Sequence, residues 1–437
     1  MGFSRVVLLA FTLCFSFVLQ AKIYIPVGDP NYKKISIALA MKKSGNQKLE
    51  QDFFKLIEHN LDYTDYFKVS AKNFVSYPSL SMLSSKQKTL YKSLGVDFVA
   101  FVSFKNNLTK ESYLELWDVN KDSMKYKAVY PLKASIKNEA RELANSTANG
   151  IVKSLSGKEG IFRTRILMSC GKRTKEIYIM DFDGRNIRRL TRDRNFSLSP
   201  SWSPSGDRIV FTSYKPARKG GFVNPNLYLV NLKKNKREVI SAAPGLNLGG
   251  SFHPTEKSKL IYTFSKNGRA EIYSLDLDKK IRKRLTNTLF FSIEPHFAPS
   301  GKRIVFSSSK TGRPHIWVAN TNGSNLKRLT FAGHYNSSPN WSPVGDKIVF
   351  VGQENKKNNF NIFSINPDGN NLKRLTGDQN FSNERPYFSP DGRFIAFSSN
   401  RDGQYRVYVM DERGENVRVL SPKKLGHCKQ PAWSPYL

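Results

Sequence analysis

Histidine and serine are the residue types through which this chain could do catalytic chemistry, and their arrangement does not favour catalysis. A metal-dependent lyase needs several histidines at one level of the fold. The six histidines stand at different offsets from the repeated aromatic residues described below: they are His59, His253, His296, His315, His334 and His427. A serine hydrolase needs a Gly-x-Ser-x-Gly elbow with Asp and His partners, and the sequence contains none. We predict no catalytic residue, no metal site and no cofactor, and keep a hydrolase or lyase as the less favoured alternative.

The first 21 residues have the layout of a secretory signal peptide. Arg5 supplies the positive charge, and the apolar run Val6–Leu19 is too short to span a bilayer comfortably. The run ends at Leu19-Gln20-Ala21, with the small residue that cleavage sites prefer. We therefore expect a periplasmic protein that binds no nucleic acid and associates with membranes only indirectly. Cys14 inside the run leaves a lipoprotein as the alternative.

The charge of the chain is strongly positive. Seventy Lys and Arg residues stand against 35 Asp and Glu residues, which gives a net charge of +35. The basic residues are scattered in pairs such as Lys279-Lys280 and Lys356-Lys357. Net charge bears on solubility and association, and it does not define the fold. Two interpretations stay open: a solvated basic surface, or attraction to an anionic envelope polymer or to lipid headgroups.

The strongest signal is an internal repeat in the second part of the chain. An aromatic residue followed two positions later by proline recurs every 44 to 50 residues, at Trp202, Phe252, Phe297, Trp341, Phe388 and Trp433. A second column of aromatics lies at Tyr178, Tyr228, Tyr273, Trp317, Phe363 and Tyr408. A third column, in an Arg-Leu-Thr pattern, has Leu190, Ile240, Leu285, Leu329, Leu375 and Leu420. Three columns of six members define six copies of one unit.

Each unit has the composition of four short antiparallel strands. Segments such as residues 303–307 are rich in β-branched and aromatic residues, and Ser-Pro-x-Gly and Asp-Gly turns separate them. A period of this length with four strands is typical of a β-propeller blade. The unit from Ile166 lacks its first strand, and residues 431–435 form a first strand with nothing after it. We predict that the two halves complete one blade and close a six-bladed ring.

The closing blade gives a prediction about the two cysteines outside the signal. Hairpin geometry in the blade of Trp202 places Ser213 beside about Leu198. By the repeat, Ser213 corresponds to Cys170 and Leu198 to Lys429, one position from Cys428. A disulfide between Cys170 and Cys428 would lock the ring; two half-buried thiols are the alternative.

The residues before the repeat predict a small mixed α/β domain. Strands are expected at Ile35–Leu39, 96–102, 113–117 and 125–132, and helices near 49–57, 86–94 and 137–155. The predicted organisation is a signal peptide at 1–21, an α/β domain at 22–158 and a six-bladed β-propeller at 159–437. The fold class is therefore mainly β.

The chain resembles the TolB family, the periplasmic propeller proteins of the Tol–Pal envelope system. The resemblance is carried by Pro-Ala-Trp-Ser-Pro-Tyr-Leu at 431–437, by Phe-Arg-Thr-Arg-Ile at 162–166, by Leu-Gly-Val-Asp at 94–97 and by the blade motif. It implies a protein-binding scaffold that serves outer-membrane integrity and cell division. The implied partners are the peptidoglycan-associated lipoprotein Pal at the propeller mouth and TolA at the mature N-terminus.

The resemblance also implies the residues of these two sites. At the mouth, where the segments leading into the inner strands meet, the candidates are Glu294, Glu384, Ser199, Leu248, Ile293, Asn336, Asn383 and Lys429. The two glutamates would accept hydrogen bonds from Pal or pair with its cations, and ordinary loop glutamates are the alternative. Leu246 stands where family members have a histidine.

The candidate TolA site is the start of the mature chain, Lys22, Ile23, Tyr24, Ile25, Pro26 and Val27. Its alternating apolar residues could add a strand to a partner sheet, or could dock on the chain's own first domain. A second function stays open because of the charge: direct binding of an anionic cell-wall glycan.

Overall fold

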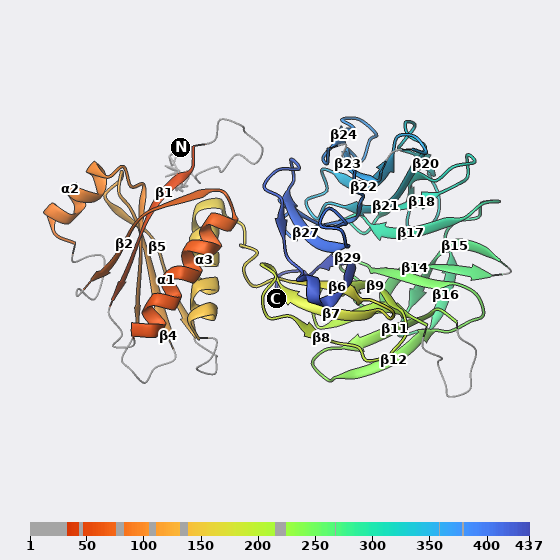
Figure 1. The fold of residues 1–437 in the computed structure, drawn as a ribbon, viewed down its shortest axis with the longest axis horizontal. Helices are drawn as coiled ribbons and strands as arrows, with labels where there is room; N and C mark the ends of the chain where they lie inside the picture. The colour runs from red at the N-terminus through yellow and green to blue at the C-terminus, as the bar shows by residue number, and fades with distance from the viewer. Residues whose placement is uncertain are drawn as a thin grey trace, which may run out of the picture.

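The computed structural model describes residues 33–42, 47–75, 83–104, 111–131, 139–214, 224–266, 268–357, 359–377 and 380–437. They form an α/β domain and a ring of six small sheets, which Figure 1 shows side by side. The predicted signal peptide and the candidate TolA segment lie outside the described residues. No helix in the described ranges is both long and apolar enough to cross a membrane.

The α/β domain is built on one five-stranded sheet in the order β2-β1-β3-β4-β5. Its strands are β1 (Ile35–Lys42), β2 (Phe67–Val75), β3 (Phe98–Phe104), β4 (Glu111–Asp118) and β5 (Ser123–Pro131). Strand β1 pairs in parallel with β2 and β3, and the remaining pairs are antiparallel. Strand β2 was not predicted from the sequence, although the buried Phe67 and half-buried Val69 alternate with exposed Lys68 and Ser70.

Helices cover both faces of this sheet. On one face, α1 (Gln47–Tyr63) and α3 (Glu139–Ser156) contribute apolar side chains such as Phe53 and Leu143 to the core. On the other face, Tyr91 of α2 (Ser85–Ser93) packs in a second apolar cluster. Helix α2 begins with a capping box, since Ser84 and Gln87 satisfy each other's backbone N–H groups.

The propeller has six four-stranded antiparallel blades, as the repeat predicts. Blade 1 contains β29 (His427–Trp433), β6 (Arg165–Gly171), β7 (Glu176–Asp181) and β8 (Arg188–Arg189). Blade 2 contains β9 (Ser197–Trp202), β10 (Arg208–Ser213), β11 (Asn226–Asn231) and β12 (Lys236–Ser241). Blade 3 contains β13 (Asn247–Phe252), β14 (Lys259–Lys266), β15 (Arg269–Asp276) and β16 (Ile281–Arg284).

The last three blades follow the same plan. Blade 4 contains β17 (Ser292–Phe297), β18 (Arg303–Ser308), β19 (His315–Asn320) and β20 (Lys327–Arg328). Blade 5 contains β21 (Tyr335–Trp341), β22 (Ile348–Gln353), β23 (Asn361–Ile365) and β24 (Lys373–Arg374). Blade 6 contains β25 (Asn383–Phe388), β26 (Phe394–Ser399), β27 (Arg406–Asp411) and β28 (Arg418–Val419). A short 3-10 helix, Lys423–Leu425, leads into β29.

The Arg-Leu-Thr column has a structural cause inside five of the blades. The hydroxyl oxygen of Thr191 accepts the backbone N–H of Ile177 at 2.9 Å, which ties the end of the fourth strand to the start of the third. The same bond recurs at Thr286, Thr330, Thr376 and Ser421. The fourth strands themselves are short, from two to six residues, so little unpaired edge faces outward.

Blade 1 is completed by the end of the chain, with β29 paired to β6. The expected register was wrong by one position, because β10 pairs Ser213 with Ser197 and Thr212 with Leu198. In blade 1 the same register sets Cys170 directly opposite Cys428. The two cysteines form a disulfide across 258 positions of sequence.

The α/β domain is fastened to blades 1 and 6. Arg141 of α3 donates to Asp181 at 3.0 Å and to Asp183 at 2.7 Å. Burial alone would raise the pKa of the Asp183 carboxyl, but its bonds to His59 and Arg141 hold it well below its usual range. Apolar side chains of both parts share one core cluster, so the interface is packed as well as charged.

Candidate binding site at the propeller mouth

Every inner strand bends at the same point, three residues before its aromatic residue. There the backbone takes a positive φ between 50° and 58°, and the strand pairing is interrupted by a bulge. We call these residues the bulge ring: Ser199, Gly249, Glu294, Ser338, Arg385 and Gln430. Five of them hold a side chain in a conformation that L-residues rarely adopt. Conserving such a bend through six blades points to a common purpose for this ring.

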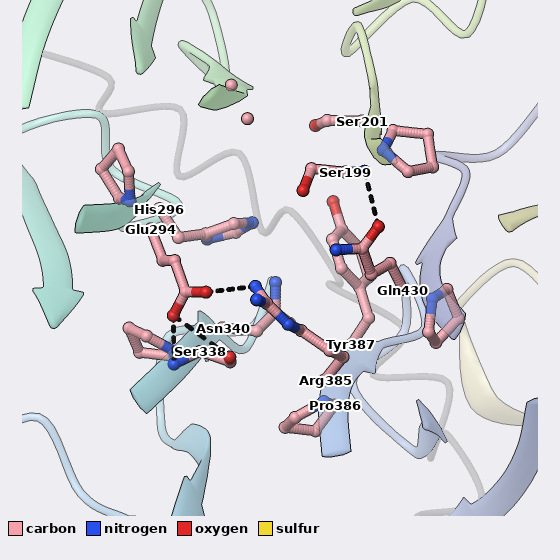
Figure 2. A pocket seen from close by; sticks show the side chains of 16 residues that line it. Ser199, Ser201, Glu294, His296, Ser338, Asn340, Arg385, Pro386, Tyr387 and Gln430 are labelled. Atoms are coloured by element: carbon pink, nitrogen blue, oxygen red, sulfur yellow. Dashed lines mark hydrogen bonds and ion pairs between the residues drawn. The ribbon is translucent and has the colours of Figure 1, made fainter. Parts of the chain in front are cut away.

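That purpose is to line a cavity on the propeller axis, which we call the mouth cavity. All six bulge-ring residues line it, together with the residue that follows each, a proline in every blade except for Gly250 in blade 3. Figure 2 shows the labelled side chains converging from several blades. Ser199 donates its backbone N–H to the Gln430 amide oxygen at 2.8 Å, so neighbouring blades are linked across this wall. Proline offers no N–H, so side chains supply the polar groups that a ligand would meet.

Glu294 is the acidic group of the mouth cavity and already has partners. Its carboxylate accepts from the Ser338 N–H at 2.7 Å and from the Ser338 hydroxyl at 3.1 Å. The guanidinium of Arg385, two blades away, forms an ion pair with the same carboxylate. Figure 2 shows the Glu294 and Arg385 side chains directed toward each other. A cation of a partner would therefore have to compete with Arg385 for Glu294.

Glu384 also has a cationic partner, nearer the rim. Its carboxylate accepts from Lys429 Nζ at 3.0 Å and from the Tyr405 hydroxyl. The Lys429 ammonium lies 3.4 Å from the centre of the Tyr405 ring. Burial and the neighbouring carboxylate raise the pKa of Tyr405, so its hydroxyl stays protonated and donates. The predicted site residues Glu384 and Lys429 are thus brought together.

The other four predicted mouth residues do not line the mouth cavity. Leu248 and Ile293 are half-buried, at the repeat position also held by Glu384 and Lys429. Asn336 and Asn383 lie one position earlier and are 4% and 0% exposed. Asn336 donates to the Ala332 carbonyl at 2.9 Å, and Asn383 accepts from Arg401 at 3.1 Å. These two asparagines, predicted at a partner surface, are instead buried, and the Asn336 amide also contacts His315 Nδ1 of the preceding blade at 3.1 Å.

The mouth cavity narrows toward the middle of the propeller. His296 and Tyr387 face each other there, with ring centres 5.7 Å apart, and both also line a second cavity at the other end of the axis. Burial lowers the pKa of His296 to about 4. The second cavity is walled by the six repeat aromatics and the prolines that follow them. The ion pair of Glu294 with Arg385 thus lies at the mouth end of the axis, and the six repeat aromatics lie at the other end.

The segments expected at the mouth include Arg385, Gln430, Ser338, Gly249 and His296, but none of these five was singled out as a site residue. The signal for the first four was available, since each stands three residues before a repeat aromatic, as Ser199 and Glu294 do. Within the described ranges, no group of three or more His, Cys, Asp and Glu side chains is placed to hold a metal ion.

Comparison with known proteins agrees with this architecture. The family model described as the TolB beta propeller domain matches residues 152–437. The Tol-Pal system protein TolB of Desulfosudis oleivorans is 33% identical over 292 residues, which is 64% of this chain and 64% of that protein. A protein TolB homolog of Chlorobium luteolum is 32% identical over 300 residues, 68% of this chain and 66% of its own length. The chain thus spans just under two thirds of these two relatives.

The fold of the whole chain has a counterpart among solved structures. TolB from Acinetobacter baumannii superposes with a TM-score of 0.75 at 24% identity, covering 92% of this chain and 97% of that one. At this identity the likeness concerns the fold alone, and it includes the α/β domain as well as the propeller. The family model covers more than half of the chain, and on that ground the protein belongs to the TolB β-propeller family.

Proposed function

We propose that this chain is a periplasmic component of a Tol–Pal system that binds the lipoprotein Pal at the mouth cavity. The observation that carries the proposal is the bulge ring, in which five of the six blades hold a polar side chain on the axis in an unfavourable backbone conformation. A strained, concave surface with a few polar groups is an expected place for binding. The two relatives named TolB and the family resemblance support Pal as the ligand.

The mouth cavity favours a partner that offers both charges. Glu294 can accept a cation, and the Arg385 guanidinium that it would release can bind a carboxylate. Exchange of one internal ion pair for two intermolecular ones leaves no charge unpaired. The need for a partner that carries both a cation and a carboxylate would contribute more to specificity than to affinity.

Replacing Glu294 tests this site. Glu294→Gln should weaken binding of purified Pal about tenfold, which corresponds to about 1.4 kcal/mol, because the amide cannot pair with a cation. Calorimetric titration measures the change. The matched control is Glu256→Gln, which makes the same charge change in the loop after β13, at the other end of the propeller. Wild-type affinity for Glu294→Gln, or an equal loss in the control, would contradict the proposal.

We also propose that the mature N-terminus binds TolA. Deleting residues 22–30 should abolish TolA binding and remove no described helix or strand, since the first of them, β1, begins at Ile35. A pull-down with purified TolA, with Pal binding as the internal control, makes the measurement. Unchanged capture of TolA by the truncated protein would end this part of the proposal.

A further inference from the structure

The positive charge of the propeller is concentrated on one side. We define the mouth face as the loops between second and third strands and between successive blades, which open on the same side as the mouth cavity. Their described residues include twelve Lys and Arg residues and three acidic ones. The loops on the opposite face carry ten Lys and Arg residues and nine acidic ones. A uniformly solvated basic surface would not show this difference between the two faces. The net positive charge of the described loops is therefore located mainly on the mouth face.

The three acidic residues of the mouth face do not neutralise its twelve Lys and Arg residues, because each is paired with an arginine outside these loops. Asp193 pairs with Arg237 at 2.7 Å, Asp402 with Arg406 at 2.7 Å, and Glu354 with Arg374 at 3.5 Å. Lys356 and Lys357, by contrast, are exposed in the loop after β22. The face therefore presents excess cations to whatever approaches it.

The same face also exposes large apolar side chains at the tips of two successive loops. Leu289 is 82% and Phe331 is 74% exposed, and Phe290 and Phe291 are 48% and 37% exposed. These loops lead into β17 and β21, neighbouring inner strands, and the loop with Lys310 and Arg313 lies between them in the chain. Arg328 lies 4.9 Å from the centre of the Phe331 ring. Apolar side chains on the same face as an excess of cations form an amphipathic surface, which scattered exposed side chains do not.

We propose that the mouth face binds directly to lipid bilayers that contain anionic lipids. Anionic headgroups attract clustered Lys and Arg side chains, and leucine and phenylalanine at loop tips can enter the interfacial layer. A soluble anionic polymer would match the cations but would leave Leu289 and Phe331 in water. The proposal goes beyond the indirect membrane association expected from the sequence. Its test needs neither Pal nor TolA, although the mouth face surrounds the cavity that we propose for Pal.

Vesicle sedimentation with the purified full chain tests this surface. Phosphatidylcholine vesicles that also contain phosphatidylglycerol should pellet the protein, and phosphatidylcholine alone should not. High salt should weaken the binding. Lys356→Glu with Lys357→Glu should lower the partition constant about tenfold or more. Leu289→Ser with Phe331→Ser should lower it about fivefold or more.

Matched controls lie on the opposite side of the propeller. Lys279→Glu with Lys280→Glu makes the same charge change, and Ile281→Ser removes a side chain that is 59% exposed, all at the turn between β15 and β16. These variants should pellet like the wild type. Soluble polyglutamate replaces the vesicles in a second arm. The proposal is overturned if the mixed vesicles do not pellet the protein, if the controls lose as much binding, or if the serine variants bind normally while polyglutamate binds as tightly as vesicles.

Discussion

Two histidines lose most of their hydration when the chain folds. Burial lowers the pKa of His296 to about 4, and burial together with Arg328 and Arg313 lowers the pKa of His315 to about 4. Between this value and the unfolded value near 6.5, the unfolded chain binds protons that the folded chain does not. The free energy of unfolding should therefore be at its full value above about pH 6.5 and fall as the pH drops toward 4.

Replacing both histidines with asparagine should flatten this decline. Asparagine occupies the position of His315 in blades 2 and 5, as Asn226 and Asn361, so the fold already accepts it there. Urea unfolding at about pH 7 and about pH 4.5 gives the difference in stability. The control is His427→Asn, at an exposed residue of β29. An unchanged pH dependence in the double variant would show that these two residues do not cause it.

The positions of single site residues were predictable where the sequence repeat marks them. Their contacts were not predictable where these depend on how the blades pack together. Glu294 and Glu384 stand out in a basic chain, and the structure places both near the mouth. The internal ion pairs with Arg385 and Lys429 could not be predicted, since they join residues of different blades. The burial of Asn336 was equally hidden, because its amide contacts His315 and the Ala332 carbonyl, which lie outside its own strand.

At the scale of the element, two turn glycines of blade 6 differ in their surroundings: Gly414 lies between β27 and β28, and Gly403 lies between β26 and β27. A Cβ added to Gly414 would lie 2.2 Å from the Leu375 carbonyl oxygen of the preceding blade, whereas one added to Gly403 would meet nothing within 4 Å. Both glycines have a positive φ, 93° and 84°. Gly403→Ala should cost about 1 kcal/mol through backbone strain, and Gly414→Ala about 2 kcal/mol or more because two blades must separate.

Chemical denaturation of the two alanine variants measures this difference. Gly403→Ala serves as the matched control, since the substitution and the backbone conformation are the same. Equal losses would mean that the close approach between blades 5 and 6 adds nothing to the strain.

The blade strands were the elements that the sequence marked most clearly, because the chain repeats them. Six copies made the blade strands visible through their shared columns, whereas β2 occurs once and was missed. Its side chains alternate, but Ala71, Lys72 and Asn73 weaken the pattern that the apolar β1 shows throughout. Periodicity in a single short segment is a weak signal, and repetition multiplies it.

At the scale of the whole molecule, the disulfide between Cys170 and Cys428 joins the two ends of the propeller. Closing a loop of 258 positions restricts the unfolded chain and should stabilise the fold by about 5 kcal/mol in the chain-entropy model. Reductant should therefore lower the melting temperature of the propeller by about 8 °C.

The variant with Cys170→Ala and Cys428→Ala supplies the control for this prediction. It should melt at the lower temperature with or without reductant in a calorimetric scan. If reductant leaves the wild type unchanged, or if it lowers the variant equally, the disulfide does not contribute to stability.

Ring closure was predictable from the half-blades at the two ends of the repeat. The surface of the propeller on which the α/β domain packs was not predictable. Arg141 and Asp183 lie far apart in a sequence rich in both charges, and nothing in their spacing pairs them. The arrangement follows from surfaces that exist only after both parts have folded.

The pairing of β29 with β6 also sets an order in time. Strand β6 is made before the other five blades, and its neighbour β29 is made after all of them. During synthesis the edge of β6 that will pair with β29 therefore stays unpaired while more than two hundred further residues are added to the chain. An unpaired strand edge can pair with the wrong strand or with another chain. The risk of misfolding or aggregation should therefore last until β29 is made and pairs with β6. A chaperone that shields β6 through this interval would protect the one junction that every other blade depends on.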